Sequence, residues 1–506
     1  MKTSQLTKKE WLVLVAAVLG SGIAFLDGTV VNVAIPTIQK FFATDLGSVL
    51  WVVNAFSLME ACLLLVSGSL SDRLGRKRLF VSGMVLFVIS SIACGFSNSI
   101  GILIVFRAMQ GVGSAMMIPG SLSLISTNTA PERRNKAIGL WSGISGAFGI
   151  VGPFVGGFIV QHFSWRMIFF INVPLGLLAI AVALYFVPES KSKTTSSIDW
   201  RGAVLVFLGL LGVSYALMSV PDAGWGSLRV LSCLTSGVVL FSTFIYTQLH
   251  AATPLLPLQI FKRPLVAGAN LMTFLLYFAL NSTFFFLMLN LQQIQKFSPL
   301  QAGLATLPAV LVITFLSGSG GTFADRYGPR LPLIAGQILV AAGIGLLLTA
   351  GADAHYFYTF FPALILFGLG MALVIAPITN SALSVSDEYS GVASGVNNAI
   401  TGVSALLAIA VLGALVVPIF TMSLHERLQA SSLTARQQEV IFLQSPKFGA
   451  IEVPFSFGAE AQAAATHAVT DSFVFSFRVM MGINVTLALM SAGVAALFIQ
   501  KKRYLI

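Results

Sequence analysis

Three ionisable side chains stand inside long apolar stretches of this sequence, where a charge is costly. Asp27 lies in "AFLDGTVVNVAIP", Glu60 in "NAFSLMEACLLL" and Arg107 in "RAMQGVGSAM". A charged side chain at the centre of a membrane helix costs about 2.5 to 3.5 kcal/mol on insertion scales, so it must face a cavity, a partner or a proton. The chemistry that these residue types allow is reversible protonation of a carboxyl group beside a fixed cation.

The composition explains why those stretches are membrane segments. Of 506 residues, 56% are hydrophobic and 9% charged, against roughly a quarter charged in a soluble domain. Apolar runs of about 20 residues recur from Trp11 to Phe498, and each can cross ~30 Å of hydrocarbon as a helix. Strands of a membrane barrel would be shorter and would alternate. We therefore expect an all-α integral membrane protein, whose first apolar run is too long for a signal peptide and is retained.

The apolar runs predict fourteen membrane helices. Their expected ranges are 11–36, 46–68, 78–97, 102–123, 136–160, 165–187, 201–220, 230–249, 264–292, 301–320, 331–350, 356–380, 394–418 and 474–499. With a cytoplasmic N-terminus, most of the 29 Lys and Arg residues fall in cytoplasmic segments. The positive-inside rule thus predicts that both termini are cytoplasmic, and the net charge of +11 reflects topology rather than nucleic-acid binding.

An internal repeat divides the chain. "GSLSDRLGRK" at 68–77 matches "GTFADRYGPR" at 321–330, and both copies join two helices on the cytoplasmic side. The offset predicts two six-helix bundles with two linker helices between them, a repeat arrangement typical of secondary transporters. The expected parts are an N-terminal bundle (1–195), a linker pair (196–262) and a C-terminal bundle (263–506). The last part carries a long external loop, about 421–472, with two surface amphipathic helices.

Polar residues follow one face of the helix that contains Arg107. Gln110, Gly111 and Ser114 lie one and two turns below it, which favours an interior position, although an arginine near a helix end can also snorkel to the surface. Asp27 lies about 16 residues along an outward-running helix, at the depth of Arg107. We expect the two side chains to meet.

Glu60 has two interpretations. With Ser57 one turn earlier, it is either a second titrating or cation-binding carboxylate near the membrane midplane, or a protonated glutamic acid bonded to a neighbouring helix. In the second half, neutral polar residues form a stripe that either grips a substrate or bonds another helix. These residues are Asn270, Thr273, Tyr277 and Asn281.

The stretch "GIVGPFVGG" predicts a packing face. Ser145, Gly149, Pro153 and Gly157 recur every four residues, so a neighbouring helix can approach this side closely.

The sequence also excludes several chemistries. It has no Gly-Lys dipeptide, hence no GxxxxGK[ST] phosphate loop, and no HExxH or CxxC arrangement. We expect no metal, no cofactor and no enzyme activity. The remaining energy source is an ion gradient, worth about 2.3 kcal/mol per charge per 100 mV.

Five motifs in order resemble a known family. "LDGTVVNVAIP", "GSLSDRLGRKR", "RAMQGVGSAM", "GIVGPFVGG" and "WRMIFFINVPLG" are similar to those of the fourteen-helix drug:proton antiporters of the QacA/EmrB type, within the major facilitator superfamily. The resemblance implies that Arg107 takes part in proton coupling. It also implies an antiporter motif at Gly149, Gly152, Pro153, Gly156 and Gly157. A cytoplasmic gate is implied at Gly68, Asp72, Arg73, Gly75, Arg76, Asp325, Arg326, Gly328 and Arg330.

Together these observations predict a proton-coupled antiporter that exports amphipathic cationic or neutral organic compounds by alternating access. Proton coupling is assigned to Asp27, Arg107 and Glu60, and the substrate cavity to Ser57, Gln110, Ser114, Asn270, Thr273, Tyr277 and Asn281. Its partners are protons, a small organic substrate and the lipid bilayer of a bacterial inner membrane, without nucleic acid. We expect a monomer, with accessory export proteins left open. Alternatives are an exporter of one endogenous metabolite and a non-transporting membrane sensor or scaffold.

Overall fold

The computed structural model describes residues 6–191, 199–251, 254–384 and 390–499. Throughout these residues the regular structure is helical, without a strand. Fourteen helices are long and apolar enough to cross a membrane, so the predicted all-α membrane architecture is confirmed. Both chain ends, whose cytoplasmic location the sequence predicts, lie outside the described residues.

The observed helices match the expected ranges, and most extend further at one or both ends. The first group comprises α1 (Lys8–Phe42), α2 (Leu46–Leu74), α3 (Arg76–Gly95), α4 (Ile100–Asn128), α5 (Pro131–His162), α6 (Met167–Phe170), α7 (Asn172–Phe186), α8 (Trp200–Ala223) and α9 (Leu228–His250). The second comprises α10 (Pro264–Leu289), α11 (Pro299–Tyr327), α12 (Arg330–Leu347), α13 (Phe360–Ala382), α14 (Ser390–Gln429), α15 (Ala435–Phe442) and α16 (Ala459–Phe498). The described residues also contain two short 3₁₀-helices, η1 (Leu258–Lys262) and η4 (Ser445–Ala450), and a short π-helix, η2 (Asn290–Ile294).

The chain forms two compact units. Unit 1 contains residues 1–34, 51–213 and 235–258, and unit 2 contains residues 35–50, 214–234 and 259–506. The expected linker helices α8 and α9 are thus each shared between the units. The division into three parts at 195/196 and 262/263 stays a prediction.

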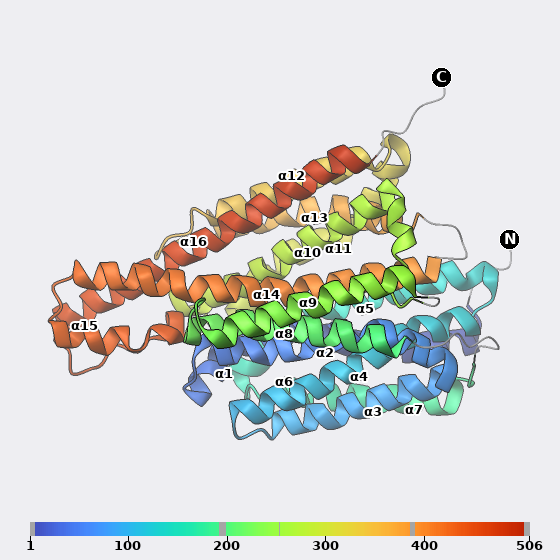
Figure 1. Ribbon diagram of the computed structural model, residues 1–506, viewed down its shortest axis with the longest axis horizontal. Coiled ribbons are helices and arrows are strands. Elements are labelled where there is room, and N and C mark those ends of the chain that lie inside the picture. Colours follow the sequence, from blue (N-terminus) through green and yellow to red (C-terminus); the bar gives the residue numbers. More distant parts are fainter. Residues whose placement is uncertain (1–5, 192–198, 252–253, 385–389, 500–506) are drawn as a thin grey trace. The chain divides into compact units, whose positions relative to one another are not determined.

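In unit 1, α3 packs closely against α4, as Figure 1 shows. Small residues permit this approach, because a Cβ atom at Gly83 would lie 2.7 Å from Cβ of Met116 and 2.9 Å from the carbonyl oxygen of Gly113. Without a hydrophobic driving force inside the bilayer, such close backbone contact is a main source of helix association. This packing positions α4, and therefore Arg107, close to α3.

In unit 2, α12 and α13 pack in the same way. A Cβ atom at Gly343 would lie 2.6 Å from the backbone nitrogen of Phe367 and 2.7 Å from the carbonyl oxygen of Ala363. Neither of these backbone atoms can move as a flexible side chain does. The glycine at 343 is therefore required by space.

The predicted external loop at 421–472 is shorter than expected. Helices α14 and α16 each have 40 residues and run on beyond the expected ends, so 421–429 and 459–472 are helical continuations. Of the two expected surface helices, one is reduced to α15 and the other is the first part of α16 (Figure 1). An ion pair at 3.0 Å between Arg427 and Asp471 joins the two long helices. Apolar periodicity marks where a helix is buried, and it cannot show that a polar helix continues into water.

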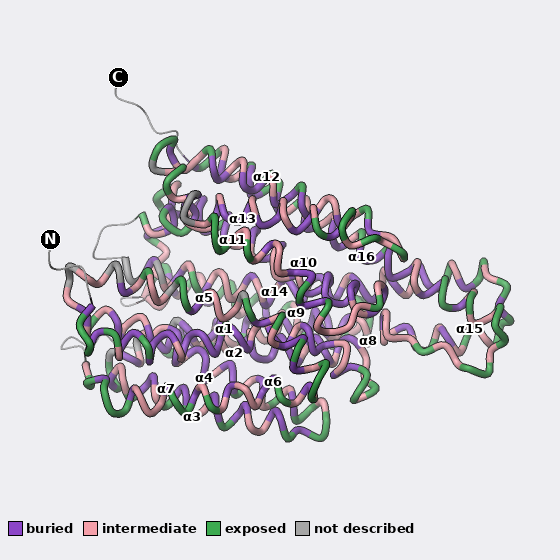
Figure 2. The backbone as a smooth tube through the Cα atoms, turned by 180° about the vertical axis from the view of Figure 1, so that it is seen from behind, coloured by how far each residue is buried: buried purple, intermediate pink, exposed green. Residues whose placement is uncertain are grey.

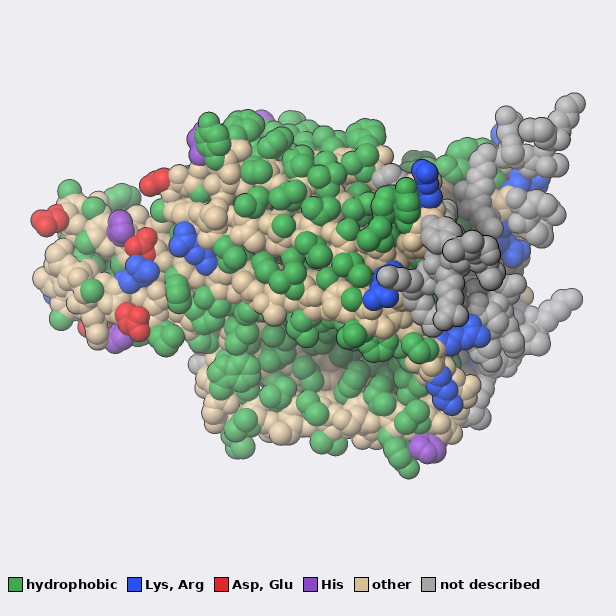
Figure 3. Space-filling model, turned by 90° about the horizontal axis from the view of Figure 1, so that it is seen from above, with side chains coloured by type: hydrophobic (Ala, Val, Ile, Leu, Met, Phe, Trp, Pro, Cys, Tyr) green, Lys and Arg blue, Asp and Glu red, His purple; other side chains and the backbone are tan. Residues whose placement is uncertain are grey.

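The exposure of the helices agrees with a lipid environment. Most of α1 is buried, whereas most of α9 is exposed, and Figure 2 shows this contrast. Apolar side chains cover much of the helical surface visible in Figure 3, while acidic side chains gather toward the end that holds α15. Exposed apolar residues such as Phe315 and Leu228 would be unfavourable in water and are favourable in lipid.

We expect Gly343→Ala to destabilise the protein by about 1 to 3 kcal/mol, because the added methyl group overpacks the contact between α12 and α13. Gly345→Ala, two residues further along α12, is the matched control. Its Cβ atom would meet only Val485, at 3.9 Å, and it gains about 1 kcal/mol of helix propensity. Thermal unfolding in detergent measures both, and equal stability of the two variants would contradict the packing argument.

Candidate functional site

Asp27 and Arg107 form an ion pair in the interior of unit 1. Asp27 comes from α1 and Arg107 from α4, and Nη1 of Arg107 donates to Oδ2 of Asp27. The side chain of Asp27 is 0% exposed and that of Arg107 is 1% exposed. Arg107 therefore does not snorkel to the surface. The structure brings together the two residues that the sequence placed at equal depth.

Two amides complete the surroundings of the Asp27 carboxylate. Nδ2 of Asn172, the first residue of α7, donates to Oδ1 of Asp27 at 2.8 Å. Nε2 of Gln110, one turn along α4 from Arg107, donates to the same oxygen at 3.4 Å. Both amide groups also donate to Oγ of Ser91 on α3, each at 3.0 Å. Four helices thus contribute to one buried polar cluster, defined here as Asp27, Ser91, Arg107, Gln110 and Asn172.

Arg107, Gln110 and Asn172 all donate to the Asp27 carboxylate, which matches an ionised carboxylate because such a group only accepts hydrogen bonds. Arg107 is further held by the carbonyl oxygen of Val52, which accepts from Nε at 3.0 Å. Its guanidinium also lies over the Phe56 ring, 4.4 Å from the centroid. A buried charge pair with this many partners meets the physical requirement for an ion pair in a low-dielectric interior.

Glu60 has a separate partner. Oγ of Ser114 on α4 donates to Oε1 of Glu60 on α2 at 2.7 Å. Unlike Asp27, Glu60 is only half-buried. Ser57, one turn earlier on α2, donates to the carbonyl oxygen of Val53 within its own helix.

The glycines of α5 pack against α1. A Cβ atom at Gly156 would lie 2.6 Å from Cγ2 of Val30, and one at Gly149 would lie 3.4 Å from Cβ of Phe25. Gly152 also meets α1, at Thr29. Gly149, a member of the expected four-residue spacing, therefore approaches α1 together with Gly152 and Gly156. This face contacts the helix that carries Asp27.

The first copy of the repeated loop is a tight turn between α2 and α3. Gly75 has φ of +111°, a backbone conformation that favours glycine. A carboxylate anchors the turn, because Oε1 and Oε2 of Glu189 accept from the backbone nitrogens of Lys77 and Arg78 at 3.1 and 3.2 Å. Negative charge at this position also favours the N-terminus of α3.

The second copy repeats this backbone geometry. Gly328, which aligns with Gly75, has φ of +83°. Lys77 donates to the carbonyl oxygen of Leu184 in the last turn of α7, and the aligned Arg330 donates to that of Ala496 in the last turn of α16. A cation at a helix C-terminus is favourable. The sequence repeat is therefore also a repeat of the helix-capping contact.

For the other predicted gate residues within the described part of the chain, the structure gives the degree of exposure. Arg73 and Arg326 are exposed and Arg76 and Gly68 are half-buried. The side chains of Asp72 and Asp325 lie outside the described residues. Their backbone belongs to the final turns of α2 and α11, so the predicted loops are shorter than expected.

In unit 2, the predicted polar stripe on α10 is partly engaged. Nδ2 of Asn397 on α14 donates to Oδ1 of Asn270 and to Oγ1 of Thr273, both at 3.1 Å. Asn281 donates to the carbonyl oxygen of Tyr277 in its own helix, at 2.7 Å. The first two residues thus join α10 to α14, while Tyr277 and Asn281 are half-buried.

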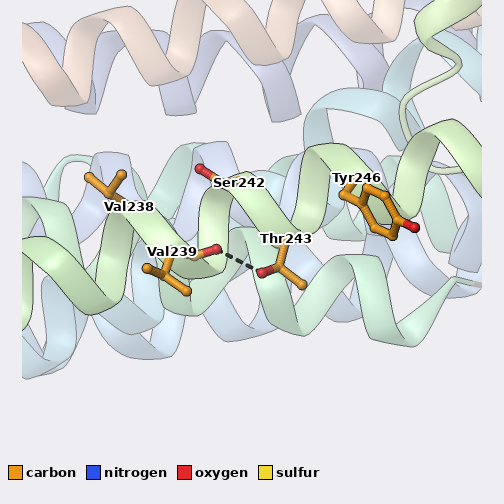
Figure 4. Close-up of a pocket in the computed structure, with 5 residues that line it drawn as sticks. All are labelled: Val238, Val239, Ser242, Thr243 and Tyr246. Carbon is orange, nitrogen blue, oxygen red and sulfur yellow. Dashed lines mark hydrogen bonds between the residues drawn. The ribbon is translucent and has the colours of Figure 1, made fainter.

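An open groove lies on α9, away from these residues. A groove of about 350 Å³ is lined by Val238, Val239, Ser242, Thr243 and Tyr246, all on one side of α9 (Figure 4). Thr243 donates to the carbonyl oxygen of Val239, as in an ordinary exposed helix. No predicted site residue lines this groove, and we interpret it as a lipid-facing surface. Among the described residues, no group of His, Cys, Asp or Glu is arranged to hold a metal ion.

Sequence reasoning missed five residues that the structure brings into these sites. Asn172 lies within the motif "WRMIFFINVPLG", where its single amide in an apolar setting was the available signal. Ser91 and Asn397 stand in helices without a distinctive pattern, and Lys77 belongs to the repeated loop. Glu189 offered no signal, since it is 114 residues from Gly75 and only the fold brings it there.

The comparisons with known proteins agree with this architecture. Residues 17–409 match the family model described as Major Facilitator Superfamily. The tetracenomycin C resistance and export protein of Streptomyces glaucescens is 35% identical over 415 residues, covering 81% of this chain and 77% of that protein. The multidrug resistance protein Stp of Mycobacterium tuberculosis is 31% identical over 444 residues, covering 86% and 81%.

Among solved structures, a bacterial homolog of the human lysosomal transporter Spinster matches with a TM-score of 0.65. It is 16% identical and covers 98% of this chain and 100% of that one. At this identity the likeness concerns the fold alone.

Fold, site and relatives thus define a multi-pass transporter of the cell membrane rather than an enzyme. The chain belongs to the Major Facilitator Superfamily.

We expect Arg107→Gln to destabilise the protein by about 3 to 5 kcal/mol, because it leaves the Asp27 carboxylate buried without its cation. Adding Asp27→Asn should restore part of that loss, so the double variant is more stable than Arg107→Gln alone. Thermal unfolding in detergent tests this at neutral pH. Additive effects of the two substitutions would mean that the pair contributes nothing to stability.

Proposed function

We propose that this transporter exports amphipathic organic compounds, cationic or neutral, in exchange for protons. The observation that carries the proposal is the buried cluster around Asp27. A carboxyl group that is 0% exposed and held only by donors can take up a proton only when its surroundings change. Coupling between protonation and conformation is what an antiporter needs.

The relatives support export of foreign compounds. One is named for resistance to and export of tetracenomycin C, and another is named for multidrug resistance. The sequence lacks a phosphate loop for ATP, which favours a proton gradient, without a cofactor, as the energy source. In this proposal Asp27 carries the proton and Arg107 balances its charge.

The remaining residues receive roles from their positions. Glu60, half-buried beside Ser114, suits a cationic substrate or a second proton. The two repeated loops, each holding the end of another helix, form a gate on the cytoplasmic side, where both termini also lie. Residues 1–195 and 263–506 act as the two moving bundles, joined by the linker pair 196–262. Ser57, Gln110, Ser114, Asn270, Thr273, Tyr277 and Asn281 face the transported compound.

A second candidate is export of one endogenous metabolite. A relative whose name specifies a single compound favours it. Accumulation of several unrelated cationic dyes in cells with and without the protein separates broad from dedicated export. A flux assay without turnover for any compound would instead favour the sensor or scaffold.

We expect Asp27→Asn to abolish proton movement driven by substrate, because an amide cannot take up and release the proton. The measurement uses reconstituted proteoliposomes, a pH-sensitive dye inside, and ethidium as the probe substrate. Asp353→Asn, at an exposed acid of the loop before α13, is the control and should couple normally. Coupling of normal size in Asp27→Asn would overturn the assignment.

We expect Glu60→Gln to reduce export of cationic dyes about tenfold or more and to spare neutral compounds, because loss of a nearby carboxylate costs at least about 1.4 kcal/mol for a cation. Ser114→Ala is the matched control, since it removes the hydrogen bond and keeps the carboxyl group. Initial export rates of a cationic and a neutral dye measure the difference. An unchanged preference would rule out a role for Glu60 in binding a cationic substrate.

A further inference from the structure

The hydrogen bonds around Asp27 leave one acceptor unused. Oδ1 of Asn172 is buried and has no hydrogen-bond partner, although the side chain is 0% exposed. An unpaired buried acceptor costs free energy of roughly 1 to 3 kcal/mol. The unpaired Oδ1 belongs to the same amide group whose Nδ2 donates to Asp27, so it requires an explanation.

The neighbouring acceptors are all occupied. Oε1 of Gln110 accepts from Arg107 at 3.0 Å and from Sγ of Cys94 at 3.3 Å. Oγ of Ser91 accepts from both amides and donates to the carbonyl oxygen of Phe169. A protonated Asp27 carries an O–H group that must donate to some acceptor. Within the cluster, the free one belongs to Asn172.

Rotation of one bond would bring this acceptor into place. A half-turn about the Cβ–Cγ bond of Asn172 exchanges Oδ1 and Nδ2, and this torsion has a broad, roughly two-fold preference. The carbonyl oxygen would then occupy the present position of Nδ2, which is 2.8 Å from Oδ1 of Asp27 and 3.0 Å from Oγ of Ser91. Both neighbours could donate to it, because the Ser91 hydroxyl can rotate away from Phe169, while Nδ2 would move to the position that Oδ1 now holds.

We propose that Asn172 is a two-position amide switch that reads the protonation of Asp27. When Asp27 is ionised, Nδ2 of Asn172 donates to it. When Oδ1 of Asp27 takes up a proton, the amide turns and its Oδ1 accepts the new O–H. Asn172 is thus a positioning residue that selects the oxygen to be protonated, and the inference rests on the proton-coupled function proposed above.

The charged and titratable groups near this switch are few. Arg107 on α4 contacts Oδ2 of Asp27, the oxygen that Asn172 does not touch. Glu60 on α2 bonds to Ser114, and the Cys94 thiol on α3 bonds to Gln110. None of these three is bonded to the Asn172 amide. Its orientation therefore depends on Asp27 and on Ser91.

The switch also reaches the backbone. Asn172 is the first residue of α7, and Ile171, the single residue between α6 and α7, keeps helical backbone angles of φ −61° and ψ −27°. A change in the hydrogen bonds of Asn172 acts on this junction between the two helices. Protonation of Asp27 on α1 can therefore bias the position of α7 through the hydrogen bond between Asp27 and Asn172.

Infrared difference spectroscopy across a pH step tests the switch in the reconstituted full-length protein. Asparagine is isotopically labelled in its side-chain amide, and the carboxylic acid band of Asp27 is identified by its absence in Asp27→Asn. We expect one labelled amide band to shift in the same step as the Asp27 band. In Asn172→Leu the amide shift should vanish, and the Asp27 band should move because its O–H has lost its acceptor.

Asn484→Leu is the matched control, because Asn484 is also a buried asparagine bonded to hydroxyl groups, but in unit 2. It should leave both bands unchanged. A titrating Asp27 band without any amide shift in the unsubstituted protein would refute the switch and leave the proposed function standing. This result does not depend on the folding of a variant. The absence of a titrating Asp27 band would refute the proton-coupled function and the switch together.

Discussion

The cost of placing charge in a membrane governs the organisation of unit 1. Asp27 and Arg107 must each find a partner out of contact with lipid, and they find one another across α1 and α4. Neither helix can rotate without exposing a charge or breaking the pair. The neighbouring helices are fixed in turn, because Ser91 on α3 and Asn172 on α7 bond to the same cluster. One ion pair thus specifies the register of four helices.

Close backbone contact at glycines stabilises the packing of helices that the ion pair alone does not hold together. Gly83 on α3 allows the approach of α4, and the glycines of α5 allow the approach of α1. Inside a bilayer these contacts gain dispersion energy where the hydrophobic effect offers none. A helix that packs through glycine can also slide with little steric obstruction. The same faces are therefore suited to stability and to movement.

The two repeated loops show how one local sequence can serve two places. In both copies a glycine with positive φ turns the chain, and a basic residue then caps the end of another helix. The first copy has an added anchor in Glu189, whose carboxylate holds the start of α3. The two loops are alike in the positive φ of their glycines, Gly75 and Gly328.

The sequence by itself determined the class of the protein and the depth of its charges. Long apolar runs can satisfy their backbone in a bilayer only as helices, so the fourteen spans followed from composition, and Asp27 and Arg107 followed from their place within them. Helix ends in water were misjudged, as the loop at 421–472 shows, because hydropathy reports burial and not helicity. Only the tertiary structure decided that Asn172 and Ser91 complete the site and that Glu189 reaches Gly75. These contacts join segments that are distant in the sequence through single polar atoms, and sequence periodicity cannot predict such contacts.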